Sequence, residues 1–256
     1  MIAIIGGSGL THLPELNITH RQIIRTPYGL PSSPVISGKL GNQFIVFLAR
    51  HGLNHALAPH EINYRANIWA LHHHGVTGIV SVASVGGIRG DLHPGDIVLP
   101  DQIIDYTWGR KSTFFDGIKS PVTHIDFTQP YDLALARRIA DAAQMLSLKI
   151  KVGAVYAATQ GPRLETAAEI NRMERDGADI VGMTGMPEAV LARELGVPYA
   201  AISVVANHAA GRGSSAAGIH FDSLEQVLQE AMGRVRSMIE RVVGCDNNCP
   251  PMGMSV

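Results

Sequence analysis

Four short segments of this sequence combine glycine or other small residues with side chains that can hold an anion. Each segment lies at the end of an apolar run that is typical of a buried strand. The segments are Gly6-Gly7-Ser8-Gly9, Ala49-Arg50-His51-Gly52, Val82-Ala83-Ser84-Val85-Gly86-Gly87 and Gly182-Met183-Thr184-Gly185. Glycine lets backbone N–H groups approach an anion, while Arg beside His supplies a fork of donors and a titratable ring. One such segment alone is equally compatible with a tight turn, but the four together predict a site for a phosphate-like anion.

Metal and dinucleotide chemistry is disfavoured by the same residues. His51 and His55 stand four positions apart, yet no carboxylate or cysteine accompanies them at ligand spacing. Gly52 between them argues against a regular helix that would bring both rings to one face. The segment 6–9 lacks the last glycine of the dinucleotide-binding pattern. We therefore expect neither a metal ion nor a dinucleotide cofactor.

The composition fixes the general class of protein. The chain has 256 residues, of which 46% are hydrophobic, and this is enough for one large buried core. Twenty-one basic and 22 acidic residues give a net charge of −1, which provides no overall field for nucleic acid or for an anionic membrane. The sequence shows no signal peptide and no apolar run of about 18 residues, and Cys245 and Cys249 have no second pair to complete a zinc site. We expect a cytoplasmic protein with free thiols and no nucleic-acid or membrane partner.

Apolar runs alternate with helical patterns along the chain. The expected strands are 2–5, 44–48, 79–85, 97–104, 152–158, 180–183 and 200–206. The expected helices are 61–74, 131–146, 165–175, 188–195 and 223–242. Strands that are apolar on both faces, with helices between them, predict a single-domain α/β fold whose mixed or parallel central sheet is flanked by helices. Ligands of such sheets bind beyond the carboxyl ends of the strands, where the four anion-binding segments stand.

The boundaries of this domain are expected at 1–244, followed by a loosely held tail at 245–256. The last helix carries the clearest signal, because Ser223 and Gln226 match a capping box and its apolar residues form one stripe. The segments 105–130 and 208–222 show neither the alternation of a strand nor the period of a helix, and we expect both to be functional loops or lids.

Seven motifs permit a comparison with known families. They are Gly6-Gly7-Ser8-Gly9-Leu10, Thr26-Pro27-Tyr28-Gly29, Ala49-Arg50-His51-Gly52, Asn63-Tyr64-Arg65-Ala66-Asn67, Pro94-Gly95-Asp96, Gly161-Pro162-Arg163-Leu164-Glu165 and Met183-Thr184-x-x-Pro187-Glu188. In order and spacing they resemble the purine nucleoside phosphorylase and methylthioadenosine phosphorylase family, nearest to its bacterial members that act on S-methyl-5′-thioinosine. The resemblance extends from residue 2 to about residue 243. It implies a nucleoside phosphorylase-like fold, a homotrimer, and transfer of a pentosyl group to inorganic phosphate without a metal or organic cofactor.

The resemblance also implies roles for individual residues. Those expected to hold the phosphate are Ser8, Arg50, His51, Ala83, Ser84 and Thr184. Leu164 and Met183 are expected to pack against the base and the ribose, and His124, in the irregular loop, to reach the site of a neighbouring subunit. Asn207 joins Arg50 and His51 as a predicted catalytic residue. Because phosphate itself is the nucleophile, no serine or carboxylate nucleophile is required.

Two positions indicate which base is bound. Adenine-specific relatives carry an Asp after the strand 200–206 and a second Asp two residues later, whereas this chain has Asn207 and Ala209. A carboxylate can only accept, so it suits the 6-amino group of adenine and repels the 6-oxo group of hypoxanthine or guanine. Glu165 aligns with the glutamate that accepts the N1–H of a 6-oxopurine. Both positions favour hypoxanthine or guanine; the alternative is a turn-forming Asn207 and a Glu165 that serves a helix dipole.

The start of the last helix bears on the 5′ substituent of the sugar. Relatives that bind ordinary nucleosides hold the 5′-hydroxyl with a His, and methylthio-specific relatives use small aliphatic residues. Leu224 aligns with this position and favours a methylthio group, and Ile219 and Val227 are expected beside it. A different alignment of 208–222 brings Ile219 or His220 to the position, and His220 would favour a 5′-hydroxyl.

The function expected from these residues is phosphorolysis of S-methyl-5′-thioinosine to hypoxanthine and 5-methylthioribose 1-phosphate. A 6-oxopurine (inosine or guanosine) nucleoside phosphorylase or a methylthioadenosine phosphorylase is the alternative within the class. A non-catalytic nucleotide-binding module is disfavoured, because it would need neither Arg50, Thr184 nor Asn207.

Overall fold

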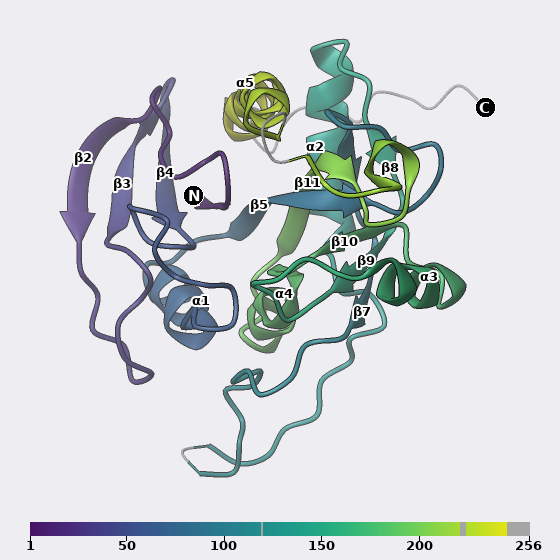
Figure 1. Cartoon of the computed structure of the whole chain (residues 1–256). Coiled ribbons are helices and arrows are strands. Elements are labelled where there is room, and N and C mark those ends of the chain that lie inside the picture. Colours follow the sequence, from purple (N-terminus) through teal and green to yellow (C-terminus); the bar gives the residue numbers. More distant parts are fainter. Residues whose placement is uncertain (119, 221–223, 245–256) are drawn as a thin grey trace.

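A mixed β-sheet runs through the centre of the computed structural model, which describes residues 1–118, 120–220 and 224–244 (Figure 1). Its strands are β1 (Ile2–Gly6), β2 (Asn17–Gln22), β3 (Val35–Leu40), β4 (Gln43–Ala49), β5 (Gly78–Gly87), β6 (Ile97–Leu99), β7 (Gln102–Asp105), β8 (Lys151–Val152), β9 (Val155–Ala158), β10 (Ile180–Gly182) and β11 (Tyr199–His208). The helices are α1 (Tyr64–His73), α2 (Leu133–Met145), α3 (Ala167–Arg175), α4 (Gly185–Glu194), α5 (Leu224–Gly244) and the 3-10 turn η1 (Gly213–Ser215). The predicted α/β fold with a mixed sheet and flanking helices is confirmed.

The long strand β5 organises the sheet. It pairs in parallel with β1 on one side and with β11 on the other, and its last two residues pair with β10 in the antiparallel direction. The strand order is β2-β3-β4-β1-β5-β10-β9-β7, while β6 and β8 extend from β11. Every residue of β1 and most of β5 are buried, as expected for strands that helices cover on both faces.

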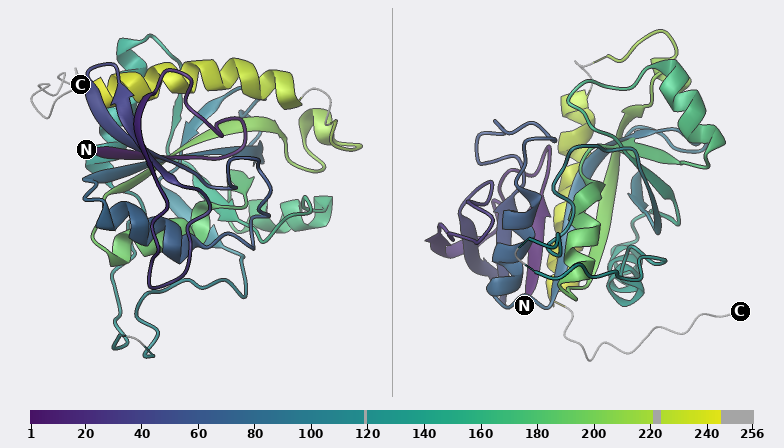
Figure 2. Two further views of the ribbon diagram at one scale, coloured as in Figure 1. Left: turned by 90° about the vertical axis from the view of Figure 1, so that its left-hand side faces the viewer. Right: turned by 90° about the horizontal axis from the view of Figure 1, so that it is seen from below.

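Helices lie on both faces of the sheet (Figure 2). α1 and α4 pack together on one face, and α2 and α5 pack together on the other. The apolar stripe of α5 is buried over its middle and end, including Val235, Met238 and Val242, none of which is exposed to solvent. α3 packs against β9 and β10 through Ile170 and Met173.

Three strand predictions need correction. The run 97–104 is divided into β6 and β7 around Pro100, which has no N–H to give to a strand ladder. The run 152–158 is divided into β8 and β9 at Gly153, whose φ of +80° turns the chain. The hairpin of β2 and β3 is absent from the predicted strands: all six residues of β2 are exposed and show no apolar alternation, and the short apolar run of β3 is interrupted by Gly38 and Lys39.

The predicted helices are present with ends that differ by a few residues. α4 begins three residues earlier than expected, with non-helical dihedral angles at Met186 and Pro187. The capping box at Ser223, both cysteines and the tail 245–256 lie outside the described residues, and the domain boundary at 244 stays a prediction. Within the described ranges, no helix combines the length and apolar sequence that a bilayer span requires.

Candidate active site

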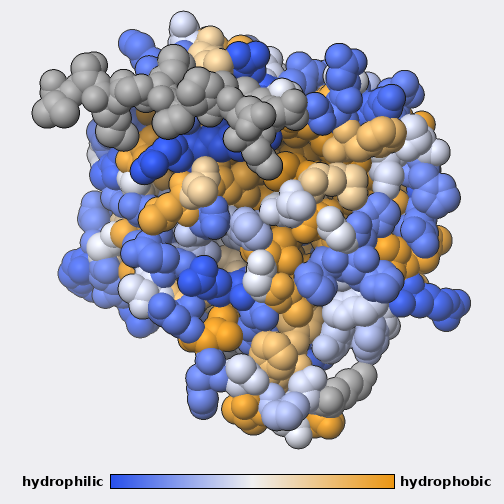
Figure 3. All heavy atoms as spheres, turned by 180° about the vertical axis from the view of Figure 1, so that it is seen from behind, coloured by the Kyte–Doolittle hydropathy of each residue, from blue (hydrophilic) through white to orange (hydrophobic). Residues whose placement is uncertain are grey.

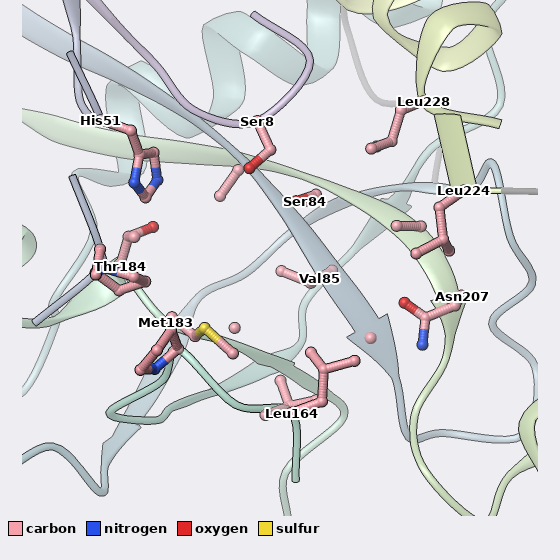
Figure 4. Close-up of a pocket in the computed structure, with 18 of the residues that line it drawn as sticks. Ser8, His51, Ser84, Val85, Leu164, Met183, Thr184, Asn207, Leu224 and Leu228 are labelled. Atoms are coloured by element: carbon pink, nitrogen blue, oxygen red, sulfur yellow. The ribbon is translucent and has the colours of Figure 1, made fainter. Parts of the chain in front are cut away.

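Residues at the ends of β5, β10 and β11, and residues just after β1 and β4, surround a cavity of about 550 Å³ at one edge of the sheet (Figure 4). The sequence-predicted residues that line it are Ser8, Arg50, His51, Ala83, Ser84, Leu164, Glu165, Met183, Thr184, Asn207, Ala209, Ile219 and Leu224. The four anion-binding segments therefore meet in one space. Val227 and His124, the two other predicted site residues, do not line this cavity.

Arg50 is the most strongly held side chain at one end of the cavity, which Ser8, His51 and Thr184 also line and which we call the anion end. It follows β4, is 1% exposed, and forms a two-point ion pair with Glu188, from Nε to Oε1 at 2.8 Å and from Nη2 to Oε2 at 2.9 Å. Nη2 also donates to Ser81 Oγ at 2.6 Å, and Nη1 donates to the Val82 carbonyl oxygen at 2.8 Å. Burial alone disfavours the charged guanidinium, but the ion pair with Glu188 outweighs it and raises the pKa of Arg50.

These contacts leave one guanidinium N–H for a ligand. An arginine has five N–H donors, and partners among the described residues occupy four of those of Arg50. The fifth, on Nη1, lies beside Gly7, where a Cβ atom would be only 2.5 Å from Nη1. Gly7 is therefore required by space: any side chain there would displace the donor.

Glu188 is held from several sides as well. Its side chain is completely buried, and Oε2 accepts from Ser81 Oγ at 2.9 Å and from Tyr199 OH at 2.8 Å, in addition to Arg50. Glu188 was quoted above only as part of a motif, and Ser81 and Tyr199 received no role at all. A serine within the apolar first half of β5, at position 81, was the signal in the sequence that could have indicated a polar network.

Two histidines stand next to this network. Nδ1 of His51 lies 2.8 Å from the carbonyl oxygen of Leu57. Burial lowers the pKa of His51 to about 4; the bond to Leu57 opposes this shift and the charge of Arg50 adds to it. The ring of His55 lies 4.4 Å from that of His51, and its Nε2 lies 3.4 Å from Ser8 Oγ. His55 also lines the cavity, although in the sequence it stood out only as half of a disfavoured metal pair with His51.

Thr184 and Ser84 bring hydroxyl groups to the same end. Thr184 precedes α4 and lines the cavity; its side chain makes no capping hydrogen bond to that helix and lies beside the Tyr156 hydroxyl. Its backbone N–H lies 3.4 Å from Tyr156 OH. Figure 4 shows Thr184, Ser84 and Ser8 around the space that His51 borders. This end of the cavity thus offers hydroxyl and guanidinium donors in a largely buried setting, which suits a tetrahedral anion.

An irregularity in β11 sets the direction of the Asn207 side chain. Val205 pairs with Val85 while Asn207 pairs with Gly86, so Ala206 is an extra residue that bulges from the ladder. The Nδ2 atom of Asn207 lies 2.6 Å from the carbonyl oxygen of His208. Because a carbonyl oxygen only accepts, this contact fixes the orientation of the amide. It leaves Oδ1 as an acceptor and one N–H as a donor.

Glu165 lies in the cavity wall and is oriented by Thr159, whose Oγ1 donates to Oε1 at 2.7 Å. The alternative role considered above, support of a helix dipole, is filled by other residues. Thr166 is the N-cap of α3 and forms a capping box with Glu169. The second carboxylate oxygen of Glu165 is thus left to accept from a ligand.

The other end of the cavity, at the start of α5, is apolar (Figure 4). Leu224 and Leu228, one turn apart at the start of α5, and Ile219 line it, whereas His220 does not. Leu228 takes the place that was predicted for Val227, which is half-buried on another side of the helix. The helical period determines this difference, since residues 224 and 228 share a face and 224 and 227 lie less directly in line.

The loop that carries His124 is anchored near the cavity and then projects from the body (Figure 1). Arg110 donates to the carbonyl oxygens of Met183, at 2.8 Å, and Gln160, at 2.8 Å, and so ties the loop to two cavity segments. Phe114 N donates to Glu194 at 2.7 Å. His124 is exposed, does not line the cavity, and comes two residues before Asp126, whose carbonyl oxygen accepts from Arg193 Nε at 3.2 Å.

Comparisons with known proteins agree with this geometry. The sequence profile of the Phosphorylase superfamily matches residues 1–244. The chain is 50% identical over 241 residues to the probable S-methyl-5′-thioinosine phosphorylase of Pseudomonas syringae pv. tomato, with 94% of this chain and 97% of that protein covered. It is 46% identical over 215 residues to the 6-oxopurine nucleoside phosphorylase of Pyrococcus furiosus, with 82% of this chain and 80% of that protein covered.

A solved structure shares the fold. The methylthioadenosine phosphorylase from Schistosoma mansoni in complex with adenine superposes with a TM-score of 0.89 at 31% identity, covering 94% of this chain and 90% of that one. The match of nearly the whole chain to one family, together with identities of up to one half, leads to one conclusion: this chain belongs to the phosphorylase superfamily.

Proposed function

We propose that this protein cleaves S-methyl-5′-thioinosine with inorganic phosphate and releases hypoxanthine and 5-methylthioribose 1-phosphate. The observation that carries the proposal is the fixed orientation of Asn207, whose amide lies in the same cavity as the anion-binding end. The relative from Pseudomonas syringae, named a probable S-methyl-5′-thioinosine phosphorylase, supports the same assignment.

In the proposed reaction a phosphate oxygen forms a bond to C1′ of the sugar while the bond from C1′ to N9 breaks. The electron pair of the broken bond goes to the purine, and in the net reaction the proton of hydrogen phosphate ends on the free base. Arg50, Ser8 and Thr184 would hold the phosphate against C1′, so the protein acts by positioning the nucleophile. Charge that develops on the departing base is stabilised at the other end.

Asn207 and Glu165 would form hydrogen bonds with the edge of the purine base and so determine which base is bound. Oδ1 of Asn207 would accept from a protonated N7, and the N–H that His208 leaves over would donate to O6. Glu165 would accept from the N1–H of a 6-oxopurine through the oxygen that Thr159 does not occupy. Adenine has an acceptor at N1 and a donor at the 6-position, so it would mismatch both residues.

The apolar part of the cavity favours a methylthio group over a hydroxyl. Leu224, Leu228 and Ile219 offer a 5′-hydroxyl no hydrogen bond, and a buried hydroxyl without a partner is costly. A 6-oxopurine nucleoside phosphorylase is the second candidate, favoured by the 46% identity to the Pyrococcus furiosus enzyme of that name. The two candidates share the phosphate and base contacts and differ only at this apolar part.

The protein is further proposed to act as a homotrimer in the cytoplasm without a metal or organic cofactor. Exposed apolar residues on the projecting loop, Ile118 and Val122, are 85% and 65% exposed, and apolar side chains extend onto that loop at the bottom of Figure 3. Such a surface is typical of a protein contact. His124, on the same loop, would then complete the cavity of a neighbouring subunit, as expected from the family.

Phosphate-dependent release of hypoxanthine tests the proposal. S-Methyl-5′-thioinosine is incubated with the protein with and without phosphate, after removal of divalent metals by a chelator. We expect release only with phosphate, and at a kcat/KM at least about tenfold above that of inosine. Release without phosphate would indicate a hydrolase, and equal use of inosine would favour the second candidate.

A further inference from the structure

The contact between His51 and Leu57 determines where the ring of His51 carries its proton. The Nδ1 atom lies 2.8 Å from the Leu57 carbonyl oxygen, and only an N–H can make a hydrogen bond to that acceptor. A neutral imidazole has one N–H, so Nε2 on the other side of the ring is left as an acceptor. Within the described residues Nε2 has no hydrogen-bond partner, although His51 is only 7% exposed and lines the cavity.

The loop between β4 and α1 makes this arrangement rigid. Leu57 N–H donates to the carbonyl oxygen of His51 at 3.1 Å, so the two residues are joined by a pair of hydrogen bonds. His55 N–H donates to Gly52 O at 3.1 Å and places the second imidazole against the first. His51 therefore cannot turn its ring to offer Nδ1 to a ligand without breaking the contact with Leu57.

We propose that His51 accepts a hydrogen bond from the P–OH group of the bound anion, so that the site selects hydrogen phosphate, HPO₄²⁻, and discriminates against sulfate. The inference rests on the proposed phosphate site. Sulfate has the same shape and the same charge of −2 but carries no proton. Its oxygen would face Nε2 as acceptor against acceptor, with no hydrogen between them.

The other groups around the anion complement the three unprotonated oxygens. Arg50 Nη1 has one free N–H, and Ser8 and Thr184 add hydroxyls that can donate. The hydroxyls of Ser8 and Thr184 can donate or accept, and the guanidinium of Arg50 can only donate, whereas Nε2 of His51 can only accept. A uniform shell of donors would bind both dianions, whereas one fixed acceptor separates them.

The charges that face His51 keep it neutral. Arg50 precedes it and opposes a second positive charge, as does His55 from the same loop, while Glu188 on α4 favours protonation but is paired with Arg50. Burial is the largest influence, and the pKa of His51 is lowered to about 4. These influences favour the uncharged ring at neutral pH, in agreement with the geometry above.

Calorimetric titration of the whole protein with sodium phosphate and with sodium sulfate tests the proposal. At about pH 7.5 we expect the dissociation constant of sulfate to exceed that of phosphate by at least about tenfold. In His51→Gln, whose amide can rotate to donate, we expect this ratio to fall by at least about fivefold. An exposed histidine of the same loop that does not line the cavity provides the matched control, because His60→Gln should retain the wild-type ratio. Equal binding of the two anions by the wild type would overturn the proposal.

A proton count tests the same claim on the wild type alone, so it does not depend on the folding of a variant. Phosphate binding is measured at alkaline pH, where free phosphate is the dianion, in two buffers that differ in ionisation enthalpy. We expect no proton uptake, and uptake of one proton would mean that His51 becomes charged and would overturn the proposal. Phosphorolysis is assayed in the same preparation: its absence would contradict the proposed function, whereas cleavage without anion discrimination would contradict only this inference.

Discussion

The two ends of the cavity are built in different ways. The anion end stands on strand ends and on a buried ion pair, in which Arg50 and Glu188 are 1% and 0% exposed. The apolar end stands on the first turn of α5 and on Ile219 in the preceding loop, and Leu224 and Leu228 there are half-buried. In a hydrogen-bonded network where each group has several partners, few substitutions are tolerated. Apolar contacts tolerate the replacement of one apolar side chain by another of similar volume. In the proposed function, strand ends therefore hold the phosphate, whereas a loop and the start of a helix contact the 5′ group of the sugar.

The largest effect is expected at the anion end. Arg50→Ala removes the guanidinium donor, and we expect kcat/KM for phosphorolysis to fall by about 100- to 1,000-fold or more. The variant also leaves Glu188 buried without its partner, which should lower the free energy of unfolding by about 3–5 kcal/mol. Steady-state kinetics and chemical denaturation measure the two effects.

A second variant separates stability from activity. In Arg50→Ala/Glu188→Gln no unpaired buried carboxylate remains, so the free energy of unfolding should recover in part. Activity should not recover, because the phosphate donor is still missing. Near-normal rates in either variant would contradict the role of Arg50.

The next effect concerns the base. Asn207→Asp with Glu165→Ser should raise the ratio of kcat/KM for S-methyl-5′-thioadenosine over S-methyl-5′-thioinosine by about 10- to 100-fold. Asn207→Asp alone should reduce both activities, because its carboxylate would face the His208 carbonyl oxygen across the present 2.6 Å contact. No rise in the ratio for the double variant would refute the assignment of these two residues.

A smaller effect is expected at the apolar end. Leu228→Ala removes apolar surface, and each lost methyl-sized contact is worth about 0.8 kcal/mol, or roughly fourfold, in kcat/KM for S-methyl-5′-thioinosine. The activity toward inosine, measured in parallel, should change less. Val227→Ala is the control, since Val227 is its neighbour on α5 and does not line the cavity. An equal loss for both nucleosides would mean that Leu228 does not contact the 5′ group.

The last effect is on stability rather than on activity, and it depends on pH. Burial lowers the pKa of His51 from 6.5 to about 4, so between these values the unfolded chain binds the proton and the folded chain does not. The free energy of unfolding should therefore rise as pH increases from about 4 to 6.5, and His51→Gln should flatten this slope. Denaturation curves at several pH values measure it; an unchanged slope would mean that His51 is protonated in the folded state.

The α/β fold could be predicted because buried strands and amphipathic helices leave periodic patterns in the sequence. β2 could not, because an exposed edge strand with residues such as Thr19 and Arg21 has no such pattern. The break at Gly153 depends on a local φ of +80°, which a glycine permits but does not require.

At the site, side chains next to strand ends were accessible to sequence reasoning and their supports were not. Ser8, Arg50 and Thr184 stand beside apolar runs, where a ligand of such a sheet is expected. Glu188 reaches Arg50 across 138 positions and Ser81 reaches Glu188 across 107, and no local pattern encodes such contacts. The orientation of Asn207 likewise depends on a bulge that becomes visible only in the paired strands.

The ratio of kcat/KM for S-methyl-5′-thioinosine over S-methyl-5′-thioadenosine, at one fixed phosphate concentration, tests the central claim most directly. The two substrates differ only at the purine edge that Asn207 and Glu165 would contact, so the sugar and phosphate contacts cancel. The donor and acceptor pattern of this cavity predicts a ratio of at least about ten in favour of the inosine derivative. A ratio near one, or a preference for the adenosine derivative, would contradict it.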